Sequence, residues 1–299
     1  MMEADPLSAM SDAREAFLSL VGALRPELHR YCARMTGSVI EGEDVVQDTL
    51  AKAYYALSRM SEAPPLRPWL FRIAHNTALD HLRRYDRKHV DLVAEPPEPA
   101  ANDDVEIDPA LVEAALSVFI GLPPMQRSAL VLKDVLGHSL EETAATMGTS
   151  VQAVKNALLR ARASVVARGA TPETARLEPA PDARARLQTY ADLFNARDWA
   201  GLRAQIGDEC RLDLVSRAER RGAGVREYYQ RYEALAPGEA LQAAVVTLEG
   251  RLALGMYRGD LGDKPAYVVL VDWLGDEIRL IRDYRYASYV AREAATPRV

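Results

Sequence analysis

Residues 66–87 read LRPWLFRIAHNTALDHLRRYDR, and this stretch predicts the helix around which the chain is organised. Apolar and small side chains recur at helical spacing on one face: Leu70, Ile73, Ala74, Thr77, Ala78 and Leu82. A polar face runs beside it: Arg72, Asn76, Asp80, Arg84 and Arg87. Asp80 precedes Arg84 by four residues, a spacing that favours an ion pair. The pattern therefore predicts an amphipathic helix with a basic, asparagine-bearing face.

The residue types on this face suit nucleic acid. Cationic side chains contact phosphates, Arg and Asn reach base edges, and aromatic rings such as Trp69 and Phe71 stack on unpaired bases. We expect these residues to bind DNA: Trp69, Arg72, His75, Asn76, Asp80, Arg83, Arg84 and Arg87. The alternative is an ordinary solvated helix surface that happens to be rich in arginine.

Length and charge limit the possible architectures. A chain of 299 residues is long for one domain and predicts two or three compact units. The net charge of −6 argues against a uniformly basic coat, but charge is sorted along the chain. Residues 66–90 hold six Arg or Lys against two Asp, whereas residues 91–108 hold seven acids and no base. We interpret residues 91–108 as an extended linker, either a plain tether or a negative segment that occupies a nucleic-acid channel.

The two cysteines, Cys32 and Cys210, have no CxxC or His companion, so we expect neither a disulfide framework nor a zinc site. No metal or other cofactor is expected, and a reducing cytoplasm is the predicted location. The first 17 residues are acidic and lack an apolar core, which argues against a signal peptide. Apolar runs fall short of membrane-spanning length, so no membrane association is expected.

Two helices are predicted before the central one. Residues 13–36 read as helix, divided near Pro26 and ended by Gly37. Residues 41–60 form a second helix whose acidic start suits a helix N-terminus. That start is either a capping feature alone or a docking surface for a basic or polar partner. The candidate docking residues are Asp44, Gln47 and Asp48.

Residues 109–167 predict a compact helical unit that ends in two helices joined by a tight turn. Ser139 and Glu142 have capping-box spacing at the start of the first helix. Gly148 makes the turn and Ser150 caps the second helix. A short helix, a glycine turn and a longer basic helix are typical of a helix-turn-helix, although an ordinary helical hairpin is the alternative. The expected DNA contacts are Ser150, Gln152, Ala153, Lys155, Asn156, Arg160 and Arg162.

Taken in order, four segments resemble a bacterial extracytoplasmic-function (ECF) sigma factor. They are EDVVQDTLAKAYYAL, WLFRIAHNTALDHLRR, the acidic linker, and LPPMQRSALVLKDVLGHSLEETAATMGTSVQAVKNALLRAR. The resemblance implies a subunit that binds core RNA polymerase and directs it to promoter DNA. It also implies that residues 41–60 dock on the polymerase and that the helix-turn-helix reads the upstream promoter element. The loop expected over residues 61–68 and the helix expected over residues 69–87 would recognise and help melt the downstream element. His75 departs from the family pattern, which usually has Arg or another polar residue there.

A second linker, residues 169–182, leads into the remaining third of the chain, residues 183–299. Helix is predicted over 183–204 and 224–235, and strand over 210–215, 241–257, 266–274 and 277–290. This order predicts a curved α+β sheet packed on helices, and it resembles the SnoaL-like, ketosteroid-isomerase-like cone that follows the sigma domains in some family members. The expected fold is multi-domain: two all-α sigma domains, a helical bundle (1–90) and a helix-turn-helix domain (109–168), followed by an α+β SnoaL-like cone.

Cones of this kind often enclose an apolar pocket, so a small-molecule ligand is a possible partner. Candidate lining residues are Asp213, Tyr228, Tyr229, Asp272, Trp273, Asp283 and Tyr284. A buried Asp can act as a general base, but no second catalytic group can be placed from the sequence. We therefore expect a regulatory domain with no catalytic residues, and no enzyme.

Two other functions stay open at this point. One is a helix-turn-helix repressor or activator that binds DNA without polymerase. The other is a SnoaL-like enzyme tethered to a DNA-binding module. The sigma-factor interpretation is preferred because only it accounts for both a docking helix and a melting helix.

Overall fold

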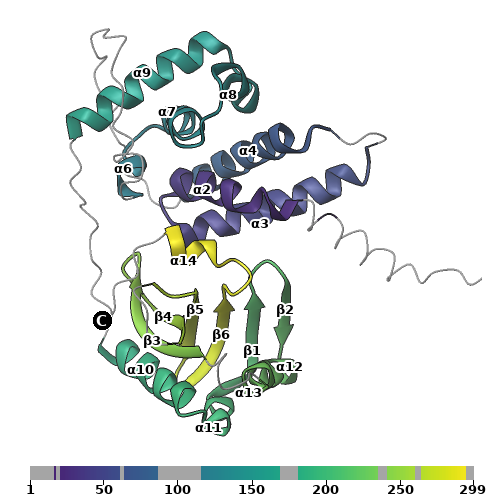
Figure 1. Cartoon of the computed structure of the whole chain (residues 1–299), viewed down its shortest axis with the longest axis vertical. Helices are drawn as coiled ribbons and strands as arrows, with labels where there is room; N and C mark the ends of the chain where they lie inside the picture. The colour runs from purple at the N-terminus through teal and green to yellow at the C-terminus, as the bar shows by residue number, and fades with distance from the viewer. Residues whose placement is uncertain are drawn as a thin grey trace, which may run out of the picture. The chain divides into compact units, whose positions relative to one another are not determined.

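The computed structural model describes Phe17 and residues 21–60, 64–86, 116–168, 181–234, 241–259 and 264–293. The chain divides into two compact units, residues 1–173 and 174–299 (Figure 1). Each unit has its own hydrophobic cluster of buried side chains. The predicted linker over residues 91–108 lies outside the described residues.

The N-terminal unit is helical. Its elements are α2 (Arg25–Thr36), α3 (Val39–Leu57), α4 (Leu66–Asp86), α6 (Ser117–Ile120), α7 (Pro124–Leu130), the π-helix η1 (Val131–Val135), α8 (Leu140–Met147) and α9 (Val151–Arg168). The central helix ends at Asp86 but begins at Leu66, inside the loop expected over residues 61–68, because Pro68 falls in the first turn, where a proline is tolerated. Helix α7 continues directly into η1, and it begins at Pro124, which occupies the first turn, where its missing N–H costs nothing.

Local sequence signals set several helix ends, and the capping box and the two glycines among them were predicted. Ser38 caps α3 by accepting a hydrogen bond from the Glu41 backbone N–H at 3.2 Å. Ser139 and Glu142 form the predicted capping box at α8. Gly37 and Gly148 end α2 and α8 with φ values of 79° and 63°, the left-handed region in which a side chain is strained.

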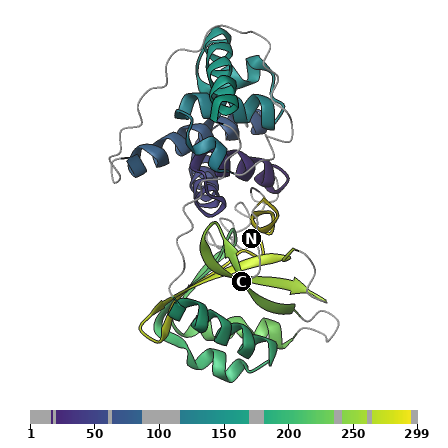
Figure 2. The ribbon, with the colours of Figure 1, turned by 90° about the vertical axis from the view of Figure 1, so that its left-hand side faces the viewer.

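The C-terminal unit packs helices on a curved sheet (Figures 1 and 2). The strand order is β2-β1-β6-β5-β4-β3, with β1 and β6 parallel and the other neighbours antiparallel. Helix α10 contacts β3 and β4, α12 contacts β1, and α14 contacts β5. The elements are α10 (Pro181–Asn195), α11 (Trp199–Ala204), β1 (Ile206–Leu214), β2 (Ala218–Arg221), α12 (Ala223–Arg226), the 3-10 helix η2 (Glu227–Tyr229), α13 (Gln230–Glu233), β3 (Leu241–Leu248), β4 (Arg251–Arg258), β5 (Tyr267–Leu274), β6 (Glu277–Asp283) and α14 (Tyr289–Glu293).

Several predicted boundaries in this unit are wrong. The helix expected over residues 183–204 breaks at Arg197, whose φ is 60°, and Asp198 caps a new helix by accepting from the Gly201 N–H. The strand expected over residues 241–257 is the hairpin β3–β4, which turns at Glu249 and Gly250. The strand expected over residues 277–290 ends at Asp283 and is followed by α14.

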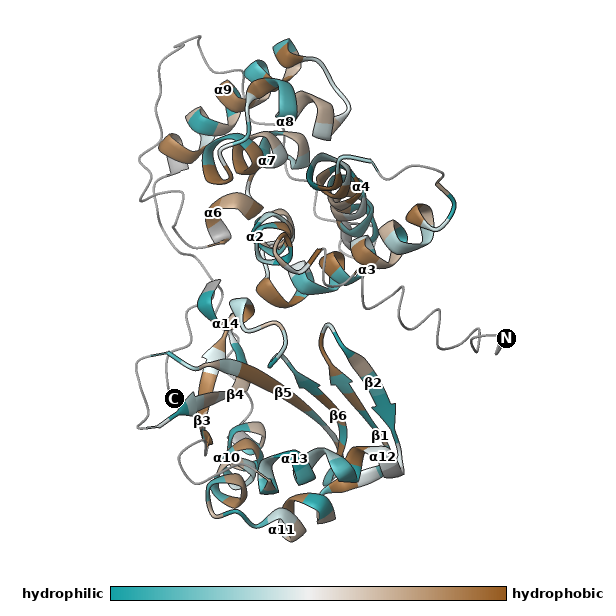
Figure 3. Ribbon diagram, turned by 45° about the vertical axis from the view of Figure 1, so that its right-hand side comes forward, coloured by the Kyte–Doolittle hydropathy of each residue, from teal (hydrophilic) through white to brown (hydrophobic). Residues whose placement is uncertain are grey.

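Strand β2 is absent from the sequence-based prediction. Its four residues are all exposed, and Figure 3 shows it hydrophilic along its length. An edge strand with no buried side chain has no alternating apolar pattern from which it could be predicted.

Within the described ranges, every helix is too short or too polar to cross a lipid bilayer. The same ranges contain no group of three or more His, Cys, Asp or Glu side chains placed to hold a metal ion.

Candidate nucleic-acid interface and buried polar network

The polar face of α4 is open to solvent. Its exposed residues are Arg72, Asn76, Asp80, Arg83 and Arg84, and Trp69 beside them is half-buried. The expected Asp80–Arg84 ion pair is replaced by two other contacts: Arg84 Nε donates to the Asp80 carbonyl oxygen at 3.3 Å, and the Asp80 carboxylate lies 3.6 Å from Arg83. The guanidinium of Arg84 is therefore held near the helix but stays accessible. Arg87 lies outside the described residues.

Two residues that we expected at this interface are buried instead. Phe71 is fully buried, with its ring packed edge-on against Tyr31 and His138 at centroid distances of 6.0 and 5.0 Å. His75 is 2% exposed, and its Nδ1 lies 2.9 Å from the Tyr31 hydroxyl and 3.0 Å from the Ser128 hydroxyl. In this structure neither side chain is available to DNA, because tertiary contacts take up the face they share.

The burial of His75 predicts a pH-dependent stability. Burial lowers the pKa of His75 to about 4, whereas an unfolded chain binds this proton near pH 6.5. The free energy of unfolding should therefore fall as the pH drops below 6.5, by up to about 3 kcal/mol near pH 4. Urea unfolding at pH 7 and pH 4 measures the effect, and His75→Gln should show a smaller pH dependence. An identical dependence in both proteins would contradict the assignment.

The predicted helix-turn-helix consists of α8, the Gly148 turn and α9. The side chains exposed on the first half of α9 are Gln152, Ala153, Lys155, Asn156 and Arg160. The Gln152 side chain donates to the Asn156 amide oxygen at 3.1 Å, so the two amides are aligned on one face. Ser150 is exposed, and its hydroxyl accepts from the Ala153 N–H at 3.1 Å, which makes it the cap of this helix.

Arg162 does not share that exposed surface. Its guanidinium makes two hydrogen bonds to the Asp134 carboxylate, at 3.0 and 2.8 Å, and both side chains are largely buried. A bidentate pair of this kind is geometrically specific and strong. Arg162 therefore joins α9 to η1, which corrects the expectation that it contacts phosphate.

The acidic and polar residues at the start of α3 differ in their exposure to solvent. Asp48 is exposed, and Asp44 and Gln47 are half-buried. Glu43 is fully buried and forms an ion pair with Arg25 of α2, which is itself nearly buried. Asp48 is consequently the most accessible of the predicted docking residues.

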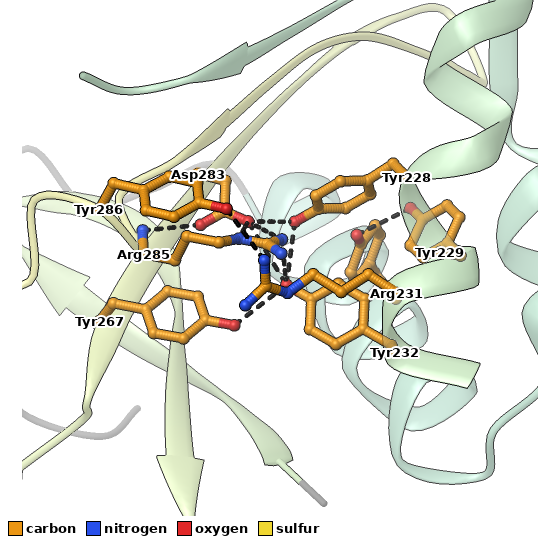
Figure 4. A network of polar contacts seen from close by, with 9 residues as sticks. Tyr228, Tyr229, Arg231, Tyr232, Tyr267, Asp283, Arg285 and Tyr286 are labelled. Atoms are coloured by element: carbon orange, nitrogen blue, oxygen red, sulfur yellow. Dashed lines mark hydrogen bonds and ion pairs between the residues drawn. The ribbon is translucent and has the colours of Figure 1, made fainter. Parts of the chain in front are cut away.

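The C-terminal unit contains a buried polar network around Asp283, at the end of β6 (Figure 4). The Asp283 carboxylate is 0% exposed and accepts from the Tyr228 hydroxyl at 2.7 Å and from Arg285 Nε at 2.5 Å. Tyr232 lies 3.4 Å from the same oxygen and 3.0 Å from the Tyr267 hydroxyl. Burial, followed by the charge of Asp283, raises the pKa of Tyr228 and Tyr232 far above the ordinary value, so both hydroxyls remain protonated donors.

The Arg285 guanidinium is enclosed by aromatic rings. It lies 5.0, 4.8 and 6.0 Å from the ring centroids of Tyr228, Tyr232 and Tyr267. It also donates to the Tyr232 hydroxyl at 2.6 Å. Cation–π attraction and the charge of Asp283 thus stabilise one buried cation from several sides. The Asp283 carboxylate already accepts hydrogen bonds from Tyr228 and Arg285. It is therefore poorly placed to take a proton from a substrate.

The predicted pocket residues do not form one group. Tyr228 and Asp283 are both part of the network, whereas the Tyr229 hydroxyl is hydrogen-bonded to the Tyr190 hydroxyl at 2.8 Å. Asp213 pairs with Arg282 at 3.2 Å. Tyr284, just beyond β6, is fully buried with Arg282 over its ring, and Asp272 and Trp273 lie near the end of β5, where the pairing with β6 is irregular. Trp273 and Tyr267 stand on the same strand, β5, but six residues apart, about 20 Å at strand spacing.

Comparison with known proteins identifies the family. The Sigma-70 region 2 model matches residues 20–88, and the Sigma-70, region 4 model matches residues 114–165. The ECF RNA polymerase sigma factor SigM of Mycobacterium tuberculosis (strain ATCC 25618 / H37Rv) is 32% identical over 151 residues, which cover 50% of this chain and 75% of SigM. The chain belongs to the ECF sigma factors.

Two other sigma factors match this chain over different fractions of its length. The ECF sigma factor SigG of the same M. tuberculosis strain is 33% identical over 202 residues, 58% of this chain, and the chain spans about half of that relative, 54%. A crystal structure of M. tuberculosis SigJ aligns with 91% of this sigma factor and 98% of that chain, at 23% identity and a TM-score of 0.35. A TM-score this low supports no structural conclusion, and the family assignment rests on the sequence matches.

Region 2 of this sigma factor comprises α2, α3 and α4, and region 4 comprises α6, α7, η1, α8 and most of α9. The exposed polar face of α4 thus belongs to region 2, and the helix-turn-helix belongs to region 4. The Asp283 network lies outside both matched segments.

Sequence reasoning missed three members of the network: Tyr232, Tyr267 and Arg285. Two of them carry a usable signal. Tyr232 follows Tyr228 by four residues, which places both on one side of a helical segment. Arg285 follows Asp283 by two residues, the spacing that would put both on one face of the strand expected over residues 277–290, although β6 itself ends at Asp283. Tyr267 has no such local signal, because it reaches the network from β5.

Proposed function

We propose that this sigma factor binds core RNA polymerase and directs it to a small set of promoters. The observation that supports the proposal most is the combination, in one ECF chain, of a solvated Arg/Asn face on α4 and a solvated polar face at the start of α9. The first suits separated strands, since Arg and Asn side chains can hold exposed bases and phosphates. The second suits a major groove, as in other helix-turn-helix domains.

We assign the proposed binding roles to three helices according to the accessible side chains on each. Asp48, with Asp44 and Gln47, docks α3 on the polymerase. Arg72, Asn76, Arg83 and Arg84 engage the downstream element while it melts. Gln152 and Asn156 meet base edges of the upstream element, and Lys155 and Arg160 contact its phosphates.

For the C-terminal unit we propose a SnoaL-like regulatory domain that modulates initiation. The order of helices and strands supports the fold, and the engaged state of Asp283 favours regulation over catalysis. The alternative is that a small-molecule ligand binds this domain and thereby regulates initiation. A tethered enzyme would need a carboxylate free to accept a proton, and Asp283 already has an arginine and two tyrosine hydroxyls as partners.

Arg84→Ala should impair promoter opening and leave polymerase binding intact. Its guanidinium is exposed and hydrogen-bonded to the helix backbone, so its loss removes a cation for the melted strand without disturbing the core. We expect about tenfold less open complex, equivalent to about 1.4 kcal/mol, measured by permanganate reactivity of unpaired thymines. Arg211→Ala, an exposed arginine on β1, is the matched control. Equal losses of polymerase binding and opening would count against this role.

Asp48→Lys should have the opposite profile. Reversing an exposed charge on a docking surface places like charges together and weakens association, here by about tenfold or more. Fluorescence titration of labelled sigma factor with core polymerase measures the affinity. Asp192→Lys, a reversal at an exposed position of α10, should leave the affinity unchanged. Unaltered affinity of Asp48→Lys would remove α3 from the docking assignment.

A further inference from the structure

Two arginine side chains of the C-terminal unit converge on one tyrosine ring. Tyr286 lies between β6 and α14 and is half-buried. Arg217, in the turn after β1, places its guanidinium carbon 4.8 Å from the centroid of the Tyr286 ring. Arg231 of α13 lies 5.9 Å from the same centroid and donates to the Tyr286 hydroxyl at 2.9 Å (Figure 4). We name these three residues the arginine–tyrosine cluster.

The two arginines of the cluster carry charge that no carboxylate balances. Both side chains are exposed, and within the described ranges neither guanidinium forms an ion pair. Six acids of β1, β2, η2, α13 and β6 are paired with other arginines: Asp208 with Arg226, Asp213 with Arg282, Glu219 with Arg221, Glu227 with Arg220, Glu233 with Arg203, and Asp283 with Arg285. Two positive charges beside one ring repel each other, and an anion bound between them would remove that repulsion.

The turn that presents Arg217 is strained. Ser216 has a φ of 77°, a backbone conformation that residues with a side chain rarely adopt. The Arg217 N–H donates to the Leu214 carbonyl oxygen at 2.8 Å, which closes the turn. Strained backbone persists only where the surrounding structure holds it, and it is concentrated at ligand-binding and catalytic sites.

The buried network around Asp283 holds the cluster in position. Arg231 directly precedes Tyr232, and Tyr286 directly follows Arg285. Because Arg285 donates to the Tyr232 hydroxyl at 2.6 Å, the network joins α13 to the segment that follows β6. The two sides of the cluster are therefore preorganised by a buried contact, and binding an anion would require little rearrangement. The paired charges of Asp283 and Arg285 cancel, so the network does not neutralise the cluster.

The geometry of the cluster suits a phosphate group. A guanidinium presents a planar fork of donors that matches the oxygens of phosphate or carboxylate. Two guanidinium groups match the charge of a phosphate monoester, about −1.5 to −2 at pH 7, better than the single charge of a carboxylate. The backbone of duplex DNA is a weaker candidate, because residues 183–299 hold eighteen Arg or Lys and seventeen Asp or Glu and so attract a polyanion little.

We propose that the arginine–tyrosine cluster binds the phosphate group of a small phosphorylated metabolite. Arg217 and Arg231 donate to the phosphate oxygens from the two sides, and Tyr286 holds the arginines together. The bound group links the turn between β1 and β2 to α13. The inference rests on the regulatory role proposed for the C-terminal unit, since the metabolite would be the input to that regulation.

Calorimetric titration of the full chain with methyl phosphate tests the site. Methyl sulfate has the same shape but a single negative charge, and we expect it to bind about tenfold more weakly or worse. Arg217→Gln and Arg231→Gln should each weaken the binding of methyl phosphate by about tenfold or more, because each removes charge-assisted hydrogen bonds. Arg211→Gln changes an exposed arginine of β1 outside the cluster and is the matched control, with the affinity of the wild type.

Tyr286→Phe separates the position of the arginines from their charge. It removes the hydroxyl that accepts from Arg231 but leaves both cations, so binding should weaken less than in Arg231→Gln. No binding of methyl phosphate, or equal losses in Arg211→Gln and the two cluster variants, would overturn the proposal. Duplex DNA binding that falls in the cluster variants, without binding of methyl phosphate, would overturn it in favour of a DNA contact.

The titration contains no polymerase, so its result is independent of whether the chain initiates transcription. Binding of methyl phosphate by a chain that yields no specific transcript would support the site and count against the sigma function alone. Specific transcription by a chain that binds no methyl phosphate would support the sigma function and overturn the site.

Discussion

Replacing Asp283 by alanine is expected to lower the free energy of unfolding of the C-terminal unit by about 3–5 kcal/mol. The substitution leaves the guanidinium of Arg285, whose side chain is only 7% exposed, without its carboxylate. It also removes an acceptor from Tyr228 and Tyr232, which are buried as well. The aromatic rings around Arg285 attract the cation, but at about 2 kcal/mol for a desolvated pair they do not replace the ion pair.

Unfolding in urea, followed by tryptophan fluorescence, measures this effect, because Trp199 and Trp273 belong to the C-terminal unit. Asp272→Ala is the matched control on the neighbouring strand, where the carboxylate is exposed, and it should change the stability by less than about 0.5 kcal/mol. A similar small change for Asp283→Ala would mean that the network contributes nothing to the fold, and a ligand role for Asp283 would return to consideration.

Replacing Glu43 by alanine should destabilise the N-terminal unit by about 3 kcal/mol or more. Glu43 is 0% exposed and pairs with Arg25, whose side chain is 9% exposed. This pair joins the first turn of α2 to the second turn of α3, and its loss leaves a guanidinium in a nearly dry site. Arg25 can recover part of the cost by turning toward water, which places the expected value at the lower end of the range for a broken buried pair.

Circular dichroism during urea unfolding follows this helical unit. Asp48→Ala, an exposed acid on the same helix, is the control for the change in charge and should alter the stability little. If both substitutions have equal effects, the burial of Glu43 does not determine its role, and the acidic start of α3 acts only through the helix dipole.

The features that could be predicted from sequence are those set by neighbouring residues. Three such features follow from local hydrogen bonds and backbone sterics: the capping box of Ser139 and Glu142, the left-handed turn at Gly148 between α8 and α9, and the left-handed end of α2 at Gly37. The exposed face of α4 follows from helical periodicity in the same way. Each of these signals extends over a few residues, so no tertiary information is needed.

The sequence could not show which side chains are buried by segments that are distant in the chain. His75 sits in the helical pattern beside exposed polar residues, and only Ser128, 53 positions away, and Tyr31 remove it from solvent. Arg162 belongs to a basic helix and would suit phosphate, but Asp134 on η1 engages it. Arg285 and Tyr267 meet because β5 and β6 pair, a long-range contact with no local signature.

Run-off transcription with core bacterial RNA polymerase on fragmented genomic DNA of the host tests the central claim most directly. The reaction is run with the full chain, with residues 1–173, and with core enzyme alone. We predict specific transcripts with the full chain that core enzyme alone does not produce, and a changed yield with residues 1–173 if the C-terminal unit is regulatory. Tight duplex binding by the full chain without polymerase, together with no specific transcript in any reaction, would contradict the sigma function and favour a helix-turn-helix repressor.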